Sequence, residues 1–126
     1  MKAEFLIEKE GISTATGFIK LDHPVKEHIG IGRKLFLLLW PEKSNTVLPA
    51  NVLCIDLDSC EIIWTINPDM YVTHSGPPNE LDIITGIIHD TESNTILCFP
   101  WDGPCIAISI ENFSIIEKKG ARWGIS

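Results

Sequence analysis

Two short segments place a histidine beside the groups that histidine needs for proton transfer. His74-Ser75-Gly76 precedes a pair of prolines, and His89-Asp90 ends an apolar run. Together they contain a Ser-His-Asp set, in which the histidine takes the serine proton and the carboxylate orients the histidine. The segment lacks the Gly-x-Ser-x-Gly elbow that presents such a serine, and a serine beside Gly and Pro is typical of a turn. We therefore expect no enzyme activity from this set.

Cysteines and histidines, four of each, are the candidate metal ligands. Five residues separate Cys54 from Cys60 and six separate Cys98 from Cys105, which is unlike the Cys-x-x-Cys of zinc and redox sites. The histidines lack the helical spacing of a metalloprotease. Phosphate-cradling loops need more glycine than Gly30-Ile-Gly-Arg-Lys34 supplies. The sequence predicts no metal, no cofactor and buried, free cysteines.

The strongest signal is electrostatic. From Ser44 to Glu117 the chain has eleven carboxylates and no lysine or arginine. The remaining six acids and ten bases lie outside this window, so its net charge is −11 and that of the two ends together is +4. Such a window repels nucleic acid and anionic lipid and attracts a basic protein, although an ordinary acidic surface has the same composition. We expect neither a nucleic-acid nor a membrane partner.

Two segments of this acidic window have the character of functional loops. The stretch from Tyr71 to Asp82 lacks strand character, and loops of about a dozen residues are often functional, although a plain connection also fits. Trp101-Asp102-Gly103 predicts a tight turn that presents a tryptophan beside a carboxylate. The candidate partner-binding residues lie in these loops or at strand ends: Tyr71, Glu80, Asp82, Asp90, Glu92, Trp101 and Asp102.

The elements that must position these residues are predicted to be strands. Nine apolar segments are short, rich in β-branched residues and bounded by turn residues. They are Glu4–Lys9, Thr16–Leu21, Lys34–Trp40, Asn51–Leu57, Glu61–Ile66, Ile83–His89, Thr95–Pro100, Cys105–Ile110 and Ser114–Lys118. The single helix alternative is one turn within Asp22–Gly32, where Pro24 suits a first turn. The sequence therefore predicts an all-β, antiparallel protein.

A degenerate internal repeat organises these strands. Shifted by 53 residues, Cys54–Ile63 lies over Ala107–Ile116, with apolar residues meeting apolar residues. An apolar strand that ends in an aromatic residue and a proline precedes both copies. This pattern predicts two blade-like repeats of three to four strands, at about residues 16–67 and 83–119, in one domain over residues 1–126. We expect them to form a small sandwich or a partly open barrel.

The segment Asn51–Trp64 resembles one outer hairpin of the quinoprotein-type β-propeller repeat. Blades of that family read as a hydrophobic strand with Asp, a turn containing Gly, and a strand ending in Trp; here Cys60 occupies the place of the turn glycine. The resemblance implies blade-like sheets. Two blades cannot close a ring, which needs about four or more. Exposed edge strands are therefore expected, and an exposed edge can accept a strand from another protein.

The amino terminus carries charges where a secretory signal would be apolar, and the longest apolar run, Leu35–Pro41, is far shorter than the roughly 20 residues of a membrane span. We expect a cytoplasmic protein. In type, the chain resembles the bacterial immunity proteins of contact-dependent toxin systems, which are short, acidic and leaderless and lack catalytic motifs. The resemblance implies a chain that neutralises a basic cognate toxin domain, such as a nuclease, by covering its active site. Its own state would be a monomer or a weak homodimer formed through an edge strand.

Two other functions fit the same sequence. One is a β module or enzyme that binds a small molecule or metal in a pocket near His74 and His89; saturable binding without a protein partner would identify it. The other is a structural subunit that contributes blades to a larger propeller-like assembly. That function predicts an obligate oligomer whose stability depends on concentration.

Overall fold

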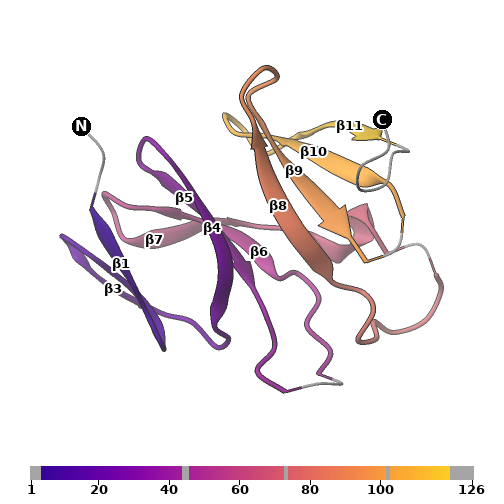
Figure 1. Ribbon diagram of the computed structural model, residues 1–126, viewed down its shortest axis with the longest axis horizontal. Coiled ribbons are helices and arrows are strands. Elements are labelled where there is room, and N and C mark those ends of the chain that lie inside the picture. Colours follow the sequence, from indigo (N-terminus) through magenta and orange to yellow (C-terminus); the bar gives the residue numbers. More distant parts are fainter. Residues whose placement is uncertain (1–3, 44–45, 73, 102, 120–126) are drawn as a thin grey trace.

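The computed structural model describes residues 4–43, 46–72, 74–101 and 103–119. In these ranges the chain forms eleven strands and one 3₁₀ turn, with no α-helix (Figure 1). The strands make three antiparallel sheets, none of which closes into a barrel. The prediction of an all-β, antiparallel fold is therefore confirmed. Within the same ranges, no helix has the length and apolar character needed to cross a membrane.

Each sheet is a simple up-and-down meander in chain order. The first sheet has the order β1-β2-β3, from strands Phe5–Glu8, Gly11–Thr14 and Gly17–Lys20. The second has the order β4-β5-β6-β7, from Val25–Ile31, Lys34–Leu39, Val52–Asp56 and Glu61–Thr65. The third has the order β11-β10-β9-β8, with β8 at Ile84–Asp90, β9 at Thr95–Pro100, β10 at Cys105–Ser109 and β11 at Ile115–Lys119.

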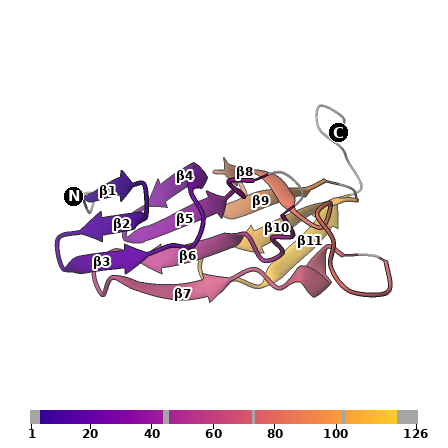
Figure 2. The same cartoon turned by 90° about the horizontal axis from the view of Figure 1, so that it is seen from below.

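The β4–β7 sheet lies between the other two (Figures 1 and 2), and its central strands β5 and β6 are buried on both faces. Along β5, Phe36 and Leu38 pack toward β8–β11, whereas Leu35, Leu37 and Leu39 pack toward β1–β3. A strand covered on both faces must be apolar at successive positions, which explains the unbroken run in β5. Each fully buried leucine contributes about 1.5–3 kcal/mol, so β5 anchors both interfaces.

The internal repeat is visible in the backbone of the last two sheets. Cys60, in the β6–β7 turn, has a φ of +57°, and Phe113, its counterpart 53 residues later in the β10–β11 turn, has a φ of +63°. This left-handed conformation is the one that glycine adopts without strain. The cysteine found in place of the expected turn glycine is therefore held in the conformation a glycine would have taken.

The structure has two strands that were not among the nine expected, and it places one of the nine in a different sheet from the one expected. Gly11–Thr14 forms β2, where a Cβ atom at Gly11 would lie 2.0 Å from the Ile19 carbonyl oxygen. The alternative of a helical turn within Asp22–Gly32 is wrong, because Val25–Ile31 forms β4. Its side chains alternate between half-buried and exposed, as in an edge strand. The strand predicted at Thr16–Leu21 is β3 of the first sheet, so the four-stranded unit that repeats begins at β4.

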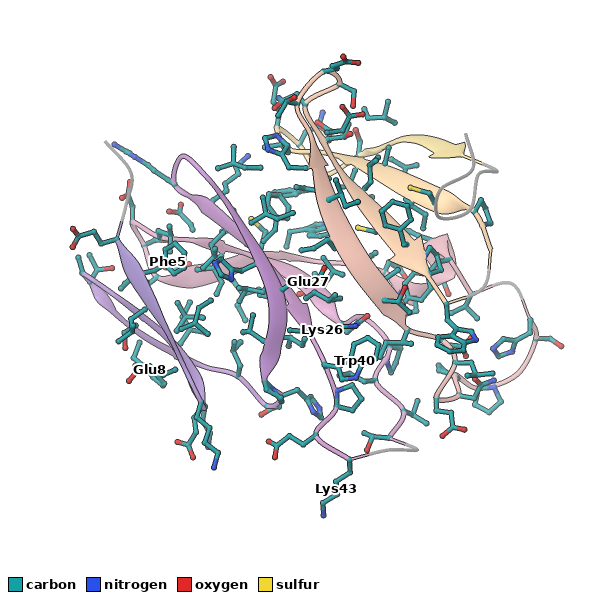
Figure 3. All side chains as sticks on the ribbon, in the orientation of Figure 1. Phe5, Glu8, Lys26, Glu27, Trp40 and Lys43 are labelled. Atoms are coloured by element: carbon teal, nitrogen blue, oxygen red, sulfur yellow. The ribbon has the colours of Figure 1, made fainter. Side chains whose placement is uncertain are left out.

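Side chains fasten the adjacent edges of the second and third sheets. The Ile87 N–H of β8 donates to a carboxylate oxygen of Glu27 on β4, at 3.0 Å. The neighbouring Lys26 ammonium donates to the Thr85 carbonyl oxygen at 3.2 Å. Figure 3 shows Lys26 and Glu27 reaching from β4 toward β8. These contacts satisfy backbone groups that an edge strand leaves unpaired, and they hold the edges of the two sheets together.

Candidate functional site

Three connections gather at one end of the molecule. In antiparallel meanders, the β5–β6, β7–β8 and β9–β10 connections must leave from the same end, the lower one in Figure 1. The opposite end has the short β4–β5, β6–β7, β8–β9 and β10–β11 turns. We call the end formed by residues 40–43, 46–51, 66–72, 74–83, 101, 103 and 104 the loop end. The β5–β6 and β7–β8 connections are the long ones at this end.

Tyr71 joins two of these connections. It follows the 3₁₀ turn Pro68–Met70, which Asn67 caps by accepting from the Asp69 N–H at 2.9 Å. The Tyr71 hydroxyl accepts from the Ala50 N–H, also at 2.9 Å, and its ring packs into the core between the second and third sheets. Burial raises the pKa of Tyr71, and the Ala50 N–H opposes that rise only in part. Tyr71 therefore acts as a neutral internal anchor.

Asp82 organises the hydrogen bonds of the β7–β8 connection. Its Oδ2 accepts from the Asn79 N–H at 2.7 Å and lies 2.6 Å from His74 Nε2. Burial disfavours the Asp82 carboxylate, but the Asn79 and His74 hydrogen bonds outweigh burial and leave its pKa below the usual range. Asp82 is 8% exposed, so its charge is directed into the loop and away from a partner.

Two neighbours of His74 favour its charged form. Its Nδ1 lies 2.9 Å from the Ser75 carbonyl oxygen, and its Nε2 faces Asp82. Both oxygens accept hydrogen bonds, so both ring nitrogens must carry a proton to satisfy them. The Ser75 carbonyl and then the Asp82 carboxylate raise the pKa of His74. This ion pair closes the loop on itself and leaves no free base for proton abstraction.

A pocket of about 280 Å³ opens over this pair. Its walls combine aromatic, apolar and polar side chains from two connections: Tyr71, His74, Asn79, Leu81, Asp82, Pro100 and Trp101. The hydroxyl, imidazole and carboxylate groups on its wall already have partners within the chain. The pocket is therefore suited to contact and shape recognition more than to nucleophilic chemistry.

A second, wider groove of about 620 Å³ shares Leu81 and Trp101 with this pocket. Its other lining residues come from the β5–β6 and β7–β8 connections: Trp40, Pro41, Glu42, Lys43, Thr46, Glu80 and Ile83. Trp101 is 61% exposed and Leu81 53% exposed, so large apolar surface faces solvent here. Lys26 Nζ lies 3.7 Å from the centre of the Trp40 ring, and Figure 3 shows the two side chains together. We call this space the tryptophan groove.

The structure divides the predicted partner-binding residues between the two ends of the third sheet. Tyr71, Asp82 and Trp101 line the pocket, and Glu80 lines the tryptophan groove beside Trp101. Asp90 and Glu92 lie beyond them in the β8–β9 turn, where Asp90 accepts from the Glu92 N–H. The strand between the two groups, β8, has seven residues, which corresponds to about 20 Å. Asp102 lies outside the described residues.

The Ser-His-Asp set considered from the sequence is not assembled. His74 and Ser75 belong to the loop end, whereas His89 and Asp90 end β8 at the opposite end. The carboxylate partner of His74 is Asp82 instead. The pocket that forms at His74 does not include His89. Spacing gave no sign of the His74–Asp82 pair, although an Asn followed three residues later by an Asp is typical of a loop that folds onto its own amides.

The described part of the chain has no cluster of three or more His, Cys, Asp or Glu that could hold a metal ion. Cys54 and Cys98 are buried free thiols and Cys60 is a half-buried one. Burial raises the pKa of Cys54 to about 12 and raises that of Cys98 as well. Cys54 and Cys98 therefore stay protonated at neutral pH and are poor nucleophiles and poor ligands.

The sequence did not point to two residues that build this end. Asn51 is fully buried, and its side-chain amide bonds to the backbone of both β5 and β8. Trp40, at the end of a predicted apolar strand, lines the tryptophan groove. No known protein family, curated protein or solved structure matches the chain.

Proposed function

We propose that the chain is a non-catalytic binding protein whose loop end docks a basic protein partner. In its specific form, it is an immunity protein that acts in the cytoplasm and neutralises a cognate toxin domain, such as a nuclease, by covering its active site. The carrying observation is the exposed Trp101 and Leu81 beside the carboxylates of Glu42 and Glu80. Exposed aromatic anchors within a polar rim are the usual energetic centre of a protein interface.

The geometry supports assigning different roles to the predicted residues. Tyr71 and Asp82 are engaged inside the loop end and would shape the surface, whereas Glu80 and Trp101 are exposed and would touch the partner. Asp90 and Glu92, at the far end of β8, would contribute through long-range attraction if the partner does not extend that far. This division makes the proposal testable residue by residue.

The test is a low-salt pull-down from the native host with the full chain as bait, followed by mass spectrometry. One basic protein recovered at equal stoichiometry, and released by salt, is the expected result. Glu80→Lys should slow association, while Glu4→Lys, an exposed control on the first sheet's side of the chain, should leave it unchanged. Equal effects of the two changes would refute the docking site. A recovered toxin domain whose activity the bait does not reduce would refute the immunity role.

One observation favours a second function, binding of a small ligand. The pocket above His74 is already formed, and aromatic and polar groups converge on it. Isothermal titration with a panel of small anions and sugars would test it, because a charged imidazole and a tyrosine hydroxyl suit oxygen-rich ligands. Saturable binding lost in His74→Gln would favour this function, and no binding across the panel would count against it.

A further inference from the structure

The tryptophan groove has aromatic walls on two sides. Trp40 comes from the end of β5 and Trp101 from the end of β9, so the two indoles belong to different sheets that the Lys26 and Glu27 contacts hold in register. Leu81 and Ile83 add apolar residues to its lining. The lining residues belong to connections, and the two packed sheets anchor the ends of these connections.

The rim of the groove is charged, with two carboxylates and one ammonium among its lining residues. Glu42 and Glu80 carry the negative charges and Lys43 the positive one, so the charges of these lining residues sum to −1. All three side chains are exposed and can move toward a ligand. The ammonium of Lys26 lies on Trp40 and adds a second positive charge on that side of the groove. Carboxylates beside an apolar surface repel an anion, and they make no favourable contact with a neutral apolar ligand. The groove fits a cation that has a flat or apolar body.

The protein already places a cation on one of these indoles. Lys26 Nζ lies 3.7 Å from the centre of the Trp40 ring, within the range of a cation–π contact. Trp101 has no such contact among the described residues, and most of its surface faces solvent. Arginine suits this vacant ring better than lysine, because its guanidinium is planar, stacks on aromatic faces and holds its hydration more weakly.

We propose that the tryptophan groove binds an arginine side chain of the protein partner. The guanidinium stacks on Trp101 and pairs with Glu80 or Glu42. The inference rests on the proposed function for its partner, but it can be tested without that partner. It names the cation that makes the contact, whereas the acidic window by itself predicts only general attraction to basic proteins.

The probe is an acetylated and amidated Gly-Arg-Gly peptide, titrated into the ¹⁵N-labelled full chain by NMR. We expect saturable shifts at the indole N–H of Trp101, and at least about fivefold weaker binding of the same peptide with citrulline, which keeps the shape and loses the charge. The matching lysine peptide should bind more weakly than the arginine peptide. Equal binding of arginine and citrulline peptides would overturn the inference.

Variants at the rim should change the affinity for the arginine peptide in opposite directions. Trp101→Leu, at an exposed position, should remove most of the binding. Glu80→Gln should weaken it about two- to threefold, and Lys43→Gln should strengthen it by a similar factor. Trp64 is a matched control, because it stacks on Phe113 within the fold and its indole signal should not move. Unchanged affinity in Trp101→Leu would exclude the groove as the arginine site.

The same variants separate this inference from the proposed function. If the pull-down recovers a basic partner that Trp101→Leu and Glu80→Gln still hold with full affinity, the groove assignment fails and the proposed function stands. If the arginine peptide binds as expected and no protein is recovered, the groove assignment stands and the proposed function fails.

Discussion

Replacing Asn51 by leucine should destabilise the protein more than any other single polar change in the described part of the chain. Asn51 is 0% exposed and lies where the β5–β6 connection meets the start of β8. Its Nδ2 donates to the carbonyl oxygens of Leu39 at 3.0 Å and Ile84 at 2.9 Å, and its Oδ1 accepts from the Ile84 N–H at 3.0 Å. The amide thus replaces a missing strand partner for β8.

The magnitude follows from what the substitution leaves behind. Leucine fills the space of asparagine but makes none of the three hydrogen bonds, so one buried N–H and two buried carbonyl groups lose a partner. An unsatisfied buried donor or acceptor costs about 1–3 kcal/mol, and carbonyls with a second partner cost least. We expect a total loss of about 3–5 kcal/mol, which is a large share of the roughly 5–15 kcal/mol that holds a domain folded.

The assay is urea unfolding followed by tryptophan fluorescence, with the free energy taken from the midpoint and slope. Asn67→Ala is the matched control, because Asn67 is exposed and its side chain makes a single hydrogen bond, which it accepts from the Asp69 N–H. Loss of that cap should cost about 1 kcal/mol. A cost below about 1 kcal/mol for Asn51→Leu would refute the argument, since the buried amide would then contribute no more than the exposed one.

Three further predictions concern other parts of the molecule. NMR titration should give His74 a pKa above its ordinary value, and this pKa should fall in Asp82→Asn. The stability that His74 contributes should be complete below about pH 6.5 and should be lost as the pH rises through the raised pKa. The stability that Asp82 contributes should be lost as the pH falls through its lowered pKa. Cys60→Gly should raise the urea midpoint or leave it unchanged by relieving the left-handed backbone, whereas Phe113→Gly should lower it, because Phe113 stacks on Trp64 with ring centres 5.3 Å apart. Ile62, 47% exposed on the edge strand β7, should promote weak self-association at high concentration, and Ile62→Lys should abolish any dimer seen by sedimentation.

Much of the fold could be predicted because local sequence and tertiary environment agree. The alternating or continuous apolar runs in β5, β6, β9 and β10 reflect burial that the structure has at those positions. The strand β4 was missed because an edge strand needs no apolar run, and because the preceding Pro24 together with the Gly30 and charged residues of the strand resembles a turn. β4 pairs with the next strand of the chain through a tight hairpin, in which Ile31 lies opposite Lys34 and Val25 opposite Leu39.

The site was predictable only in part. Turn residues and the absence of strand character identified the Tyr71–Asp82 loop and the Trp101 turn, and the structure brings both to the loop end. Direction was not predictable: a carboxylate in a loop can face solvent or fold inward, and Asp82 folds inward onto Asn79 and His74. The sequence also did not show that Asp90 lies at the opposite end of β8 from the loop end.

The charge separation along the sequence is reduced by the fold. Lys34 donates to the Ile110 carbonyl oxygen, Arg33 pairs with Asp58 at 2.7 Å, and Lys26 donates to the Thr85 carbonyl oxygen. Three bases from the first third of the chain thus lie against residues of the acidic window and partly neutralise its field. A partner close to the surface therefore meets local carboxylates within a Debye length of about 8 Å, and not a uniform field of eleven charges. The position of Glu42 and Glu80 beside two tryptophans matters more for recognition than the net charge of the window.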